Sequence, residues 1–383
     1  MYSQQDLDEA VAAGALDAPS ANSLRNFLDR DRGTPSVDEE QFRLITSFND
    51  IFVSIASLIM LFAVGWIAQS IGQAAGLVIS EQGRNGPSFL APAAIAATAW
   101  GLALFFTAKR RMALPSIILV FAFVGGVLIA TAMFEAQLLM LSSDNISDSP
   151  LFKDNEPMAK LFVGGLGAIA AAVATAAAYI HWRKFRVPVT VAAGAAAAVG
   201  VLLAILAAMV PNRIDELRDI MLVATLLLGV GVFLFAMRWD ASDQARVTRR
   251  SDVAFWLHLL AAPMLVHPVF TLLGLNDGNA TIGEGLIVIA LYVVLAIAAL
   301  AIDRRALLVS ALAYVLYALT ELFKQIGAVE LSVAFTALLI GSALLLLSAY
   351  WHQARRLIVS RLPGKLTERL PHLDRVASLQ PAA

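Results

Sequence analysis

The stretch AKLFVGGLGAIAAAVATAAAYIHWRKFRVPVTVAAGAAAAVGVLLAILAAM, residues 159–209, contains two long apolar runs that are separated only by the basic cluster RKFR at 183–186. Each run reaches the roughly 20 residues that a helix needs to cross a bilayer. Small residues recur along both runs at a spacing of four, which lets helix backbones approach closely in lipid. They are Gly164, Ala168, Ala172 and Ala176 in the first run, and Ala192, Ala196, Gly200 and Ala204 in the second. The stretch therefore predicts a tightly packed hairpin of two membrane-spanning helices.

The whole chain shares this composition, because 59% of its 383 residues are hydrophobic and only 15% are charged. Soluble domains are typically about 45–50% apolar and about 25% charged. Ten apolar runs lie at about 51–79, 89–108, 113–134, 158–182, 187–210, 217–238, 253–274, 283–302, 306–323 and 329–351. We therefore predict an all-α, polytopic helical membrane bundle of about ten transmembrane helices. The lack of cysteine excludes disulfides, thiolate metal sites and thiol nucleophiles.

Basic residues cluster in alternate connections between these runs, at 109–111, 183–186, 238–250 and 303–305. Of the 28 Lys and Arg residues, 22 fall on the side shared with both termini and 6 on the other side. Cytoplasmic loops of membrane proteins carry an excess of Lys and Arg. The asymmetry predicts that both termini are cytoplasmic.

Three domains follow from the charge pattern: an N-terminal tail at 1–47, a membrane domain at 48–351 and a C-terminal tail at 352–383. The N-terminal tail holds nine acids against four arginines. It predicts a helical hairpin, whose first helix ends at Gly14 and whose second is capped by Asp17 or Ser20. We expect this hairpin to offer a surface to a protein partner.

The C-terminal tail carries six basic residues against two acids. Its segment ARRLIVSRLPGKLTERL, at 354–370, alternates basic and aliphatic residues, as does an amphipathic helix that lies on anionic lipid headgroups. Pro363 and Gly364 interrupt that helix. The predicted partners are thus the lipid bilayer, anionic headgroups and a possible protein, with no sign of nucleic-acid binding.

The N-terminal segment LDEAVAAGALDAPSANSLRNFL, at 7–28, followed later by spans with basic turns, resembles a group of uncharacterised bacterial polytopic inner-membrane proteins. Members of that group carry a short helical hairpin before the first span. The resemblance implies a multi-pass protein of the bacterial inner membrane. It implies no functional residues.

Three basic turns begin similar segments: KRRMALPSIIL at 109–119, RKFRVPVTVAA at 183–193 and DRRALLVSALA at 303–313. The similarity suggests helical hairpins as repeated building units. A simpler explanation is topology alone, because every short cytoplasmic turn carries basic residues.

The run FWLHLLAAPMLVHPVF at 255–270 contains two histidines and two prolines. His258 and His267 are nine residues apart, which places them on opposite sides of a straight helix turning about 100° per residue. His258 is expected near the cytoplasmic end of its span. His267 is expected in the outer third, where Pro263 and Pro268 bend the helix and open a gap beside it.

Polar residues inside spans usually face the bundle interior or a wet cavity. The ninth run has a polar stripe of helical spacing that includes Tyr314, Tyr317 and Glu321, and helix rise places Glu321 at the depth of His267. Gln69 of the first run and Thr336 of the tenth run reach a similar depth. The candidate polar pocket therefore consists of His267, Glu321, Tyr314, Tyr317, Gln69 and Thr336.

Simpler roles remain open for the members of this pocket. The simpler role of Gln69 is a bond to a neighbouring helix, since amides inside spans commonly make one. The simpler role of Glu321 is a local pair with Lys324 at the membrane edge. The simpler role of His267 is a bond to a backbone carbonyl that a proline has freed.

The sequence contains no P-loop, HExxH or GxSxG motif. We therefore assign no catalytic, cofactor-binding or metal-binding residues, expect no cofactor, and predict that the protein is not an enzyme. Its most favoured role is that of a membrane scaffold or regulatory component. The alternative is a secondary transporter of a small solute, proton-coupled through His267 and Glu321, because ten spans accommodate two inverted repeats of five.

Overall fold

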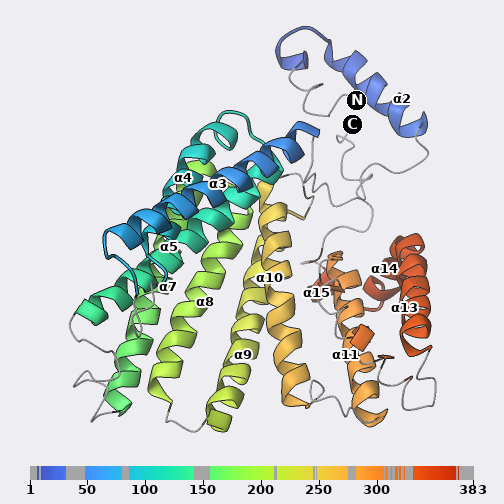
Figure 1. The fold of residues 1–383 in the computed structure, drawn as a ribbon. Helices are drawn as coiled ribbons and strands as arrows, with labels where there is room; N and C mark the ends of the chain where they lie inside the picture. Colours follow the sequence, from blue (N-terminus) through green and yellow to red (C-terminus); the bar gives the residue numbers. More distant parts are fainter. Residues whose placement is uncertain are drawn as a thin grey trace. The chain divides into compact units, whose positions relative to one another are not determined.

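The computed structural model describes residues 7, 10–31, 48–79, 86–141, 156–210, 214–244, 246, 248–274, 282–305, 307–308, 312, 315–317, 319–320, 323, 331–367 and 370. All regular structure within these ranges is helical (Figure 1). The chain divides into two compact units, one made of residues 1–42 with 373–383 and one of residues 43–372. The all-α prediction is confirmed for the described residues.

The first unit contains α2 (Ala18–Asp31). Gly14 precedes it with φ of +70°, and its N–H donates to the carbonyl of Val11 at 3.1 Å, so that a helical turn ends there as predicted. The Asp17 carboxylate accepts a hydrogen bond from the Ser20 N–H at 3.2 Å. Asp17, rather than Ser20, therefore caps α2, and the hydrogen bonds from the side chain and backbone of Ser20 lower the pKa of Asp17.

The second unit contains the membrane helices. Among the described residues, seven helices are long and apolar enough to cross a membrane. They are α3 (Phe48–Ala74), α5 (Ala113–Leu141), α7 (Glu156–Phe185), α8 (Val189–Met209), α9 (Ile214–Ala241), α10 (Arg249–Leu272) and α13 (Ser332–Ala349). The shorter apolar helices α4 (Leu90–Phe106) and α11 (Ile282–Ile302) match two further predicted runs. The ninth predicted run lies mostly outside the described residues, so the count of ten stays a prediction.

Helices that follow one another in the chain pack most extensively, as pairs α4–α5, α7–α8 and α9–α10. α3 packs on the α4–α5 pair, α5 contacts α7, and α8 contacts α10 (Figure 1). α10 continues as one helix through Pro263 and Pro268. This order joins α3 to α10 into one series of hairpins, as the basic turns predict.

The α7–α8 hairpin is confirmed, although its seam differs from the predicted rows. Gly164 of α7 faces Ala204 and Ala208 of α8, and farther along the seam Ala171 faces Gly200. Within the predicted rows, Ala172, Ala176 and Ala196 are exposed instead. A strict spacing of four advances about 40° per step around a helix of 3.6 residues per turn, so such a row leaves the contact face after a few steps.

The four basic turns lie at one end of the second unit, which we call the basic end. Aromatic contacts of Trp100 with His181 and Phe185 place the end of α4 beside the end of α7. Each turn contains a residue with a left-handed backbone, unusual outside glycine. These residues are Arg111, Arg186, Arg246 and Asp303, with φ between 53° and 56°. The repeat seen in three basic turns therefore extends to backbone conformation.

Helix α14 (Trp351–Val359) begins at the predicted boundary between membrane domain and C-terminal tail at 351/352, and the division into these two domains stays a prediction. Helix α14 contacts both α13 and α11. Its residues Trp351, Arg355 and Val359, four apart, are buried. α14 ends before Pro363, and α15 (Gly364–Thr367) follows. The opposite face of α14 exposes Arg356 and Leu357, and its contact with lipid headgroups stays a prediction.

Candidate functional site: a buried charge cluster at the basic end

The candidate site centres on Asp240, which is buried in the last turn of α9 with 1% of its side chain exposed. One carboxylate oxygen accepts from His258 Nε2 of α10 at 3.0 Å and from Arg304 Nε at 3.2 Å. The other accepts from Arg304 Nη2. The Arg304 guanidinium also donates to the backbone carbonyl of Ser251 at 3.0 Å and to its hydroxyl at 3.1 Å. We call Asp240, Ser251, His258 and Arg304 the interlock.

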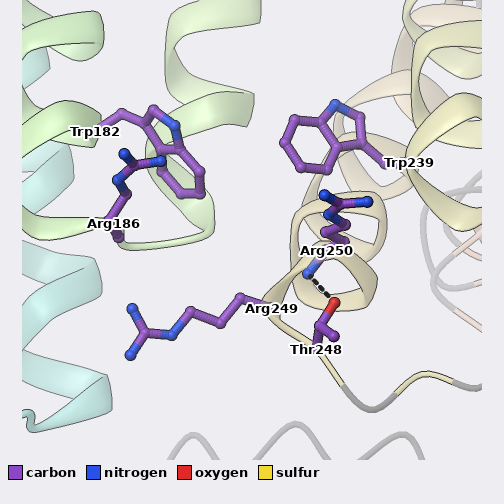
Figure 2. Close-up of a pocket in the computed structure, with 6 residues that line it drawn as sticks. All are labelled: Trp182, Arg186, Trp239, Thr248, Arg249 and Arg250. Carbon is purple, nitrogen blue, oxygen red and sulfur yellow. Dashed lines mark hydrogen bonds between the residues drawn. The ribbon is translucent and has the colours of Figure 1, made fainter. Parts of the chain in front are cut away.

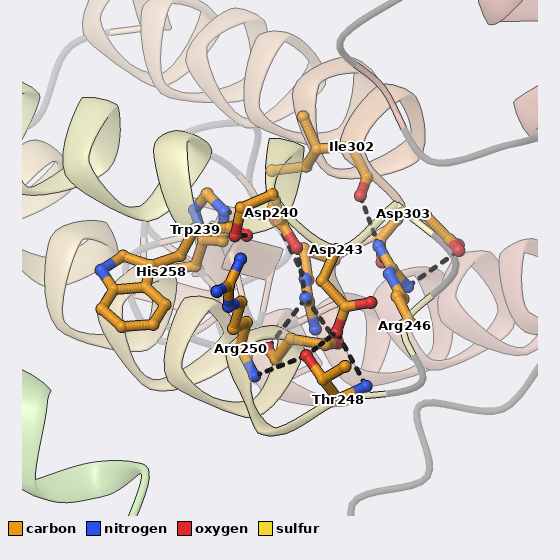
Figure 3. A network of polar contacts seen from close by, with 12 residues as sticks. Trp239, Asp240, Asp243, Arg246, Thr248, Arg250, His258, Ile302 and Asp303 are labelled. Carbon is orange, nitrogen blue, oxygen red and sulfur yellow. Dashed lines mark hydrogen bonds and ion pairs between the residues drawn. The ribbon is translucent and has the colours of Figure 1, made fainter.

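A second acid, Asp303, adjoins the interlock (Figure 3). Its carboxylate accepts from Arg246 at 3.0 Å and from the Trp351 indole at 2.7 Å, and Arg355 lies 4.0 Å away. The Arg246 guanidinium donates in addition to the carbonyl of Ile302 at 2.7 Å. These contacts join the α9–α10 turn to the end of α11 and to the start of α14.

The local backbone explains why these groups converge. The left-handed residue Arg246 turns the chain between α9 and α10, and Asp303 does the same at the end of α11. Thr248 then begins α10, because its hydroxyl oxygen accepts from the Arg250 N–H at 3.2 Å. Asp243 fixes Thr248 by accepting from its N–H at 2.9 Å and from its hydroxyl at 2.6 Å.

The charges of the interlock balance within the site. A buried carboxylate is tolerated only when it is paired and hydrogen-bonded, and Asp240 has a bidentate guanidinium and an imidazole. Only Nδ1 of His258 has no hydrogen-bond partner. In the part of the chain described, no group of three His, Asp or Glu side chains is arranged to hold a metal ion. The paired charges of Asp240 and Arg304 are therefore suited to fastening the helices together.

A third histidine, His181 of α7, is fully buried beneath the α7–α8 turn. Its Nδ1 lies 3.1 Å from the Thr190 hydroxyl of α8, and Nε2 has no partner. Trp100, Phe123 and Phe185 surround the ring, with centroids between 4.6 and 5.9 Å away. The contact with the Thr190 hydroxyl and the surrounding aromatic rings indicate that His181 serves to pack these helices together.

Of the predicted pocket residues, Gln69 has hydrogen-bond partners within its own part of the chain. Gln69 donates to the Gly86 carbonyl at 3.1 Å and accepts from the Ser88 N–H at 2.8 Å. It thereby fastens α3 to the segment before α4, which is the simpler of its two predicted roles. α3 packs on α4 and α5, so Gln69 belongs to a different part of the helix series from His267 of α10.

The other predicted pocket residues belong to later helices or lie outside the described residues. His267 is exposed. Thr336 is buried, with its hydroxyl 3.4 Å from that of Thr320, and Tyr317 is half-buried. Glu321 and Tyr314 lie outside the described residues, so a meeting of His267 with Glu321 stays a prediction.

Sequence reasoning missed Asp240, Arg304 and His181. Arg304 and Asp240 are 64 residues apart, and each lies in a turn whose basic residues already have an explanation in topology. His258 is predicted near the cytoplasmic end of its span, and its side chain is fully buried. The available signal was the presence of acids, Asp240 and Asp303, inside turns that topology requires to be basic.

No known protein family, no curated protein and no solved structure matches this chain. The site must therefore be interpreted from its own geometry.

Proposed function

We propose that this chain is a scaffold or regulatory component of the bacterial inner membrane, without enzymatic activity and with both termini in the cytoplasm. The apolar helices make it a multi-pass membrane protein. The observation that supports the scaffold role is the interlock, in which Arg304 with 2% exposure holds the ends of α9 and α10 to that of α11. Under this proposal, these contacts hold the helix ends in a fixed arrangement on the cytoplasmic side. Exposed basic side chains at the basic end then bind partners.

The hydrogen bonds of the interlock are suited to a fixed connection between helices. Both oxygens of Asp240 are engaged, and Arg304 bonds to two helices at once. Any transport cycle that moved these helix ends apart would leave buried charges without partners, at a cost of several kcal/mol. A static role avoids that cost.

Solute flux provides the test of this proposal. Purified protein in proteoliposomes, with a pH gradient or a membrane potential imposed, is expected to pass a panel of sugars, amino acids, organic acids and inorganic ions at the rate of protein-free vesicles. Uptake of any solute that depends on the protein would overturn the scaffold proposal. If Glu321→Gln or His267→Gln abolished that uptake, the function would be proton-coupled transport.

Topology is tested by reporter fusions. Fusions after Arg111, Arg186, Arg250, Arg305 and the C-terminus are all expected to report the cytoplasm, because 22 of the 28 basic residues fall on that side. A fusion after Gly274 should report the opposite side. A periplasmic signal from any of the first five would contradict the ten-span arrangement at that turn.

A further inference from the structure

A pocket of 530 Å³ opens at the basic end beside the interlock (Figure 2). Three segments line it, from the end of α7, the end of α9 and the start of α10. The lining residues are Trp182, Arg186, Trp239, Thr248, Arg249 and Arg250. Its volume lies within the range of about 300–1,000 Å³ typical of small-ligand sites. Neither the interlock nor the scaffold role uses this pocket.

The two tryptophans form one wall of the pocket. Their rings meet edge to face with centroids 6.4 Å apart, and the Arg186 guanidinium lies over the Trp182 ring at 5.6 Å from its centroid. Figure 2 shows the Arg249 side chain extending through the space below the indoles, whereas the Arg186 side chain turns up toward Trp182. The ring contacts hold Arg186 in place, which reduces the entropy that it would lose on binding a ligand.

The lining of the pocket is positively charged, and Asp252 of α10 lies close enough to Arg249 for their charges to interact. The lining includes three arginines and no carboxylate. Within the described ranges, none of these three guanidinium groups takes part in an ion pair, in contrast to Arg246 and Arg304. Asp243 lies nearby, but it accepts both hydrogen bonds of Thr248. Guanidinium groups arranged in this way favour an anion with several oxygens, of which phosphate is the best geometric match.

The depth of the pocket indicates where the phosphate comes from. Trp182 and Trp239 occupy the last turns of two membrane-crossing helices, the level at which tryptophan is enriched at membrane interfaces. Basic pockets between transmembrane helices on the cytoplasmic side bind lipid headgroups. We propose that this pocket binds the phosphate of an anionic phospholipid from the leaflet at the basic end. The indoles cover the glycerol portion, and the arginines bind the phosphate oxygens.

Thermal unfolding of the full chain in neutral detergent tests this binding. Short-chain phosphatidylglycerol is expected to raise the unfolding temperature, whereas short-chain phosphatidylcholine, inorganic phosphate and glycerol phosphate at matched concentrations are not. The double variant Arg186→Gln/Arg249→Gln should weaken the apparent affinity roughly tenfold for each guanidinium removed. Added salt should weaken the binding to the parent protein.

The matched control is Arg110→Gln/Arg305→Gln, which removes the same charge from two exposed arginines of other basic turns. It should keep the affinity of the parent protein. Equal weakening in this control would show attraction to bulk charge and overturn the site. A full effect of glycerol phosphate or inorganic phosphate would overturn the lipid as ligand and assign a soluble phosphate compound. If the double variant failed to fold, Arg249→Gln alone would serve, because its side chain is exposed.

Discussion

Replacing Arg304 with methionine is expected to lower the free energy of unfolding by about 3–5 kcal/mol, the range for removing one partner of a buried ion pair. The variant would leave the Asp240 carboxylate buried, with His258 as its remaining partner in the interlock. It would also remove the bonds to Ser251 that join the end of α11 to α10. Unfolding by SDS titration in mixed micelles, followed by tryptophan fluorescence, measures the change.

The neighbouring residue provides the control for this variant. Arg305 is exposed and lies over the Trp351 ring at 4.9 Å from its centroid. Arg305→Met removes the same charge from the same turn, yet should cost no more than about 1 kcal/mol, as for exposed cation–π contacts. The double variant Asp240→Leu/Arg304→Met should be more stable than Arg304→Met alone, since no unpaired carboxylate remains. Equal losses at 304 and 305 would show that the interlock does not stabilise the fold.

Replacing Gly164 with alanine is expected to destabilise the α7–α8 hairpin by about 1–3 kcal/mol, as overpacking of a close contact does. A Cβ added at this position would lie near Ala208 Cβ and 3.0 Å from both the Ala204 carbonyl oxygen and Ala208 Cα. Two of these three atoms belong to the backbone, so the helices themselves must move apart. Thermal unfolding in detergent measures the effect.

The adjacent residue again serves as control. A Cβ added at Gly165 meets no atom within 4 Å. Gly165→Ala should therefore leave stability unchanged or raise it by up to about 1 kcal/mol through helix propensity. A similar loss in both variants would mean that the seam at Gly164 does not limit the approach of the helices.

The helices themselves could be predicted from the sequence because membrane crossing imposes a strong pattern. The apolar runs on either side of RKFR at 183–186 coincide with α7 and α8, since about 20 apolar residues admit few other structures. The seam between them was less predictable, because small residues are abundant in both runs and only the turn of the helix selects those that meet. Composition therefore determines where the helices span the membrane more firmly than it determines which residues meet between them.

The candidate site was much less predictable, for a physical reason. Asp240 and Arg304 meet only when α9 and α11 end at the same level beside α10, which is a property of tertiary packing. In the sequence, each residue belongs to a charged turn that the positive-inside rule already explains. Gln69 was ambiguous for a similar reason: an amide inside a span serves a helix contact or a solute equally well, and its partners, Gly86 and Ser88, became evident only in the structure.

The left-handed residues of the basic turns bear on how the protein enters the membrane. A glycine at Arg111 or Arg186 would adopt the observed φ without steric cost, whereas an arginine there costs about 1–2 kcal/mol. The nascent chain is oriented during insertion by its positive charges, before any of these turns has formed. Under the proposed topology, the arginines at these two positions contribute to the charge asymmetry that orients the chain, at the cost of that steric strain. At Arg111 and Arg186, the backbone therefore retains a strain that glycine would relieve.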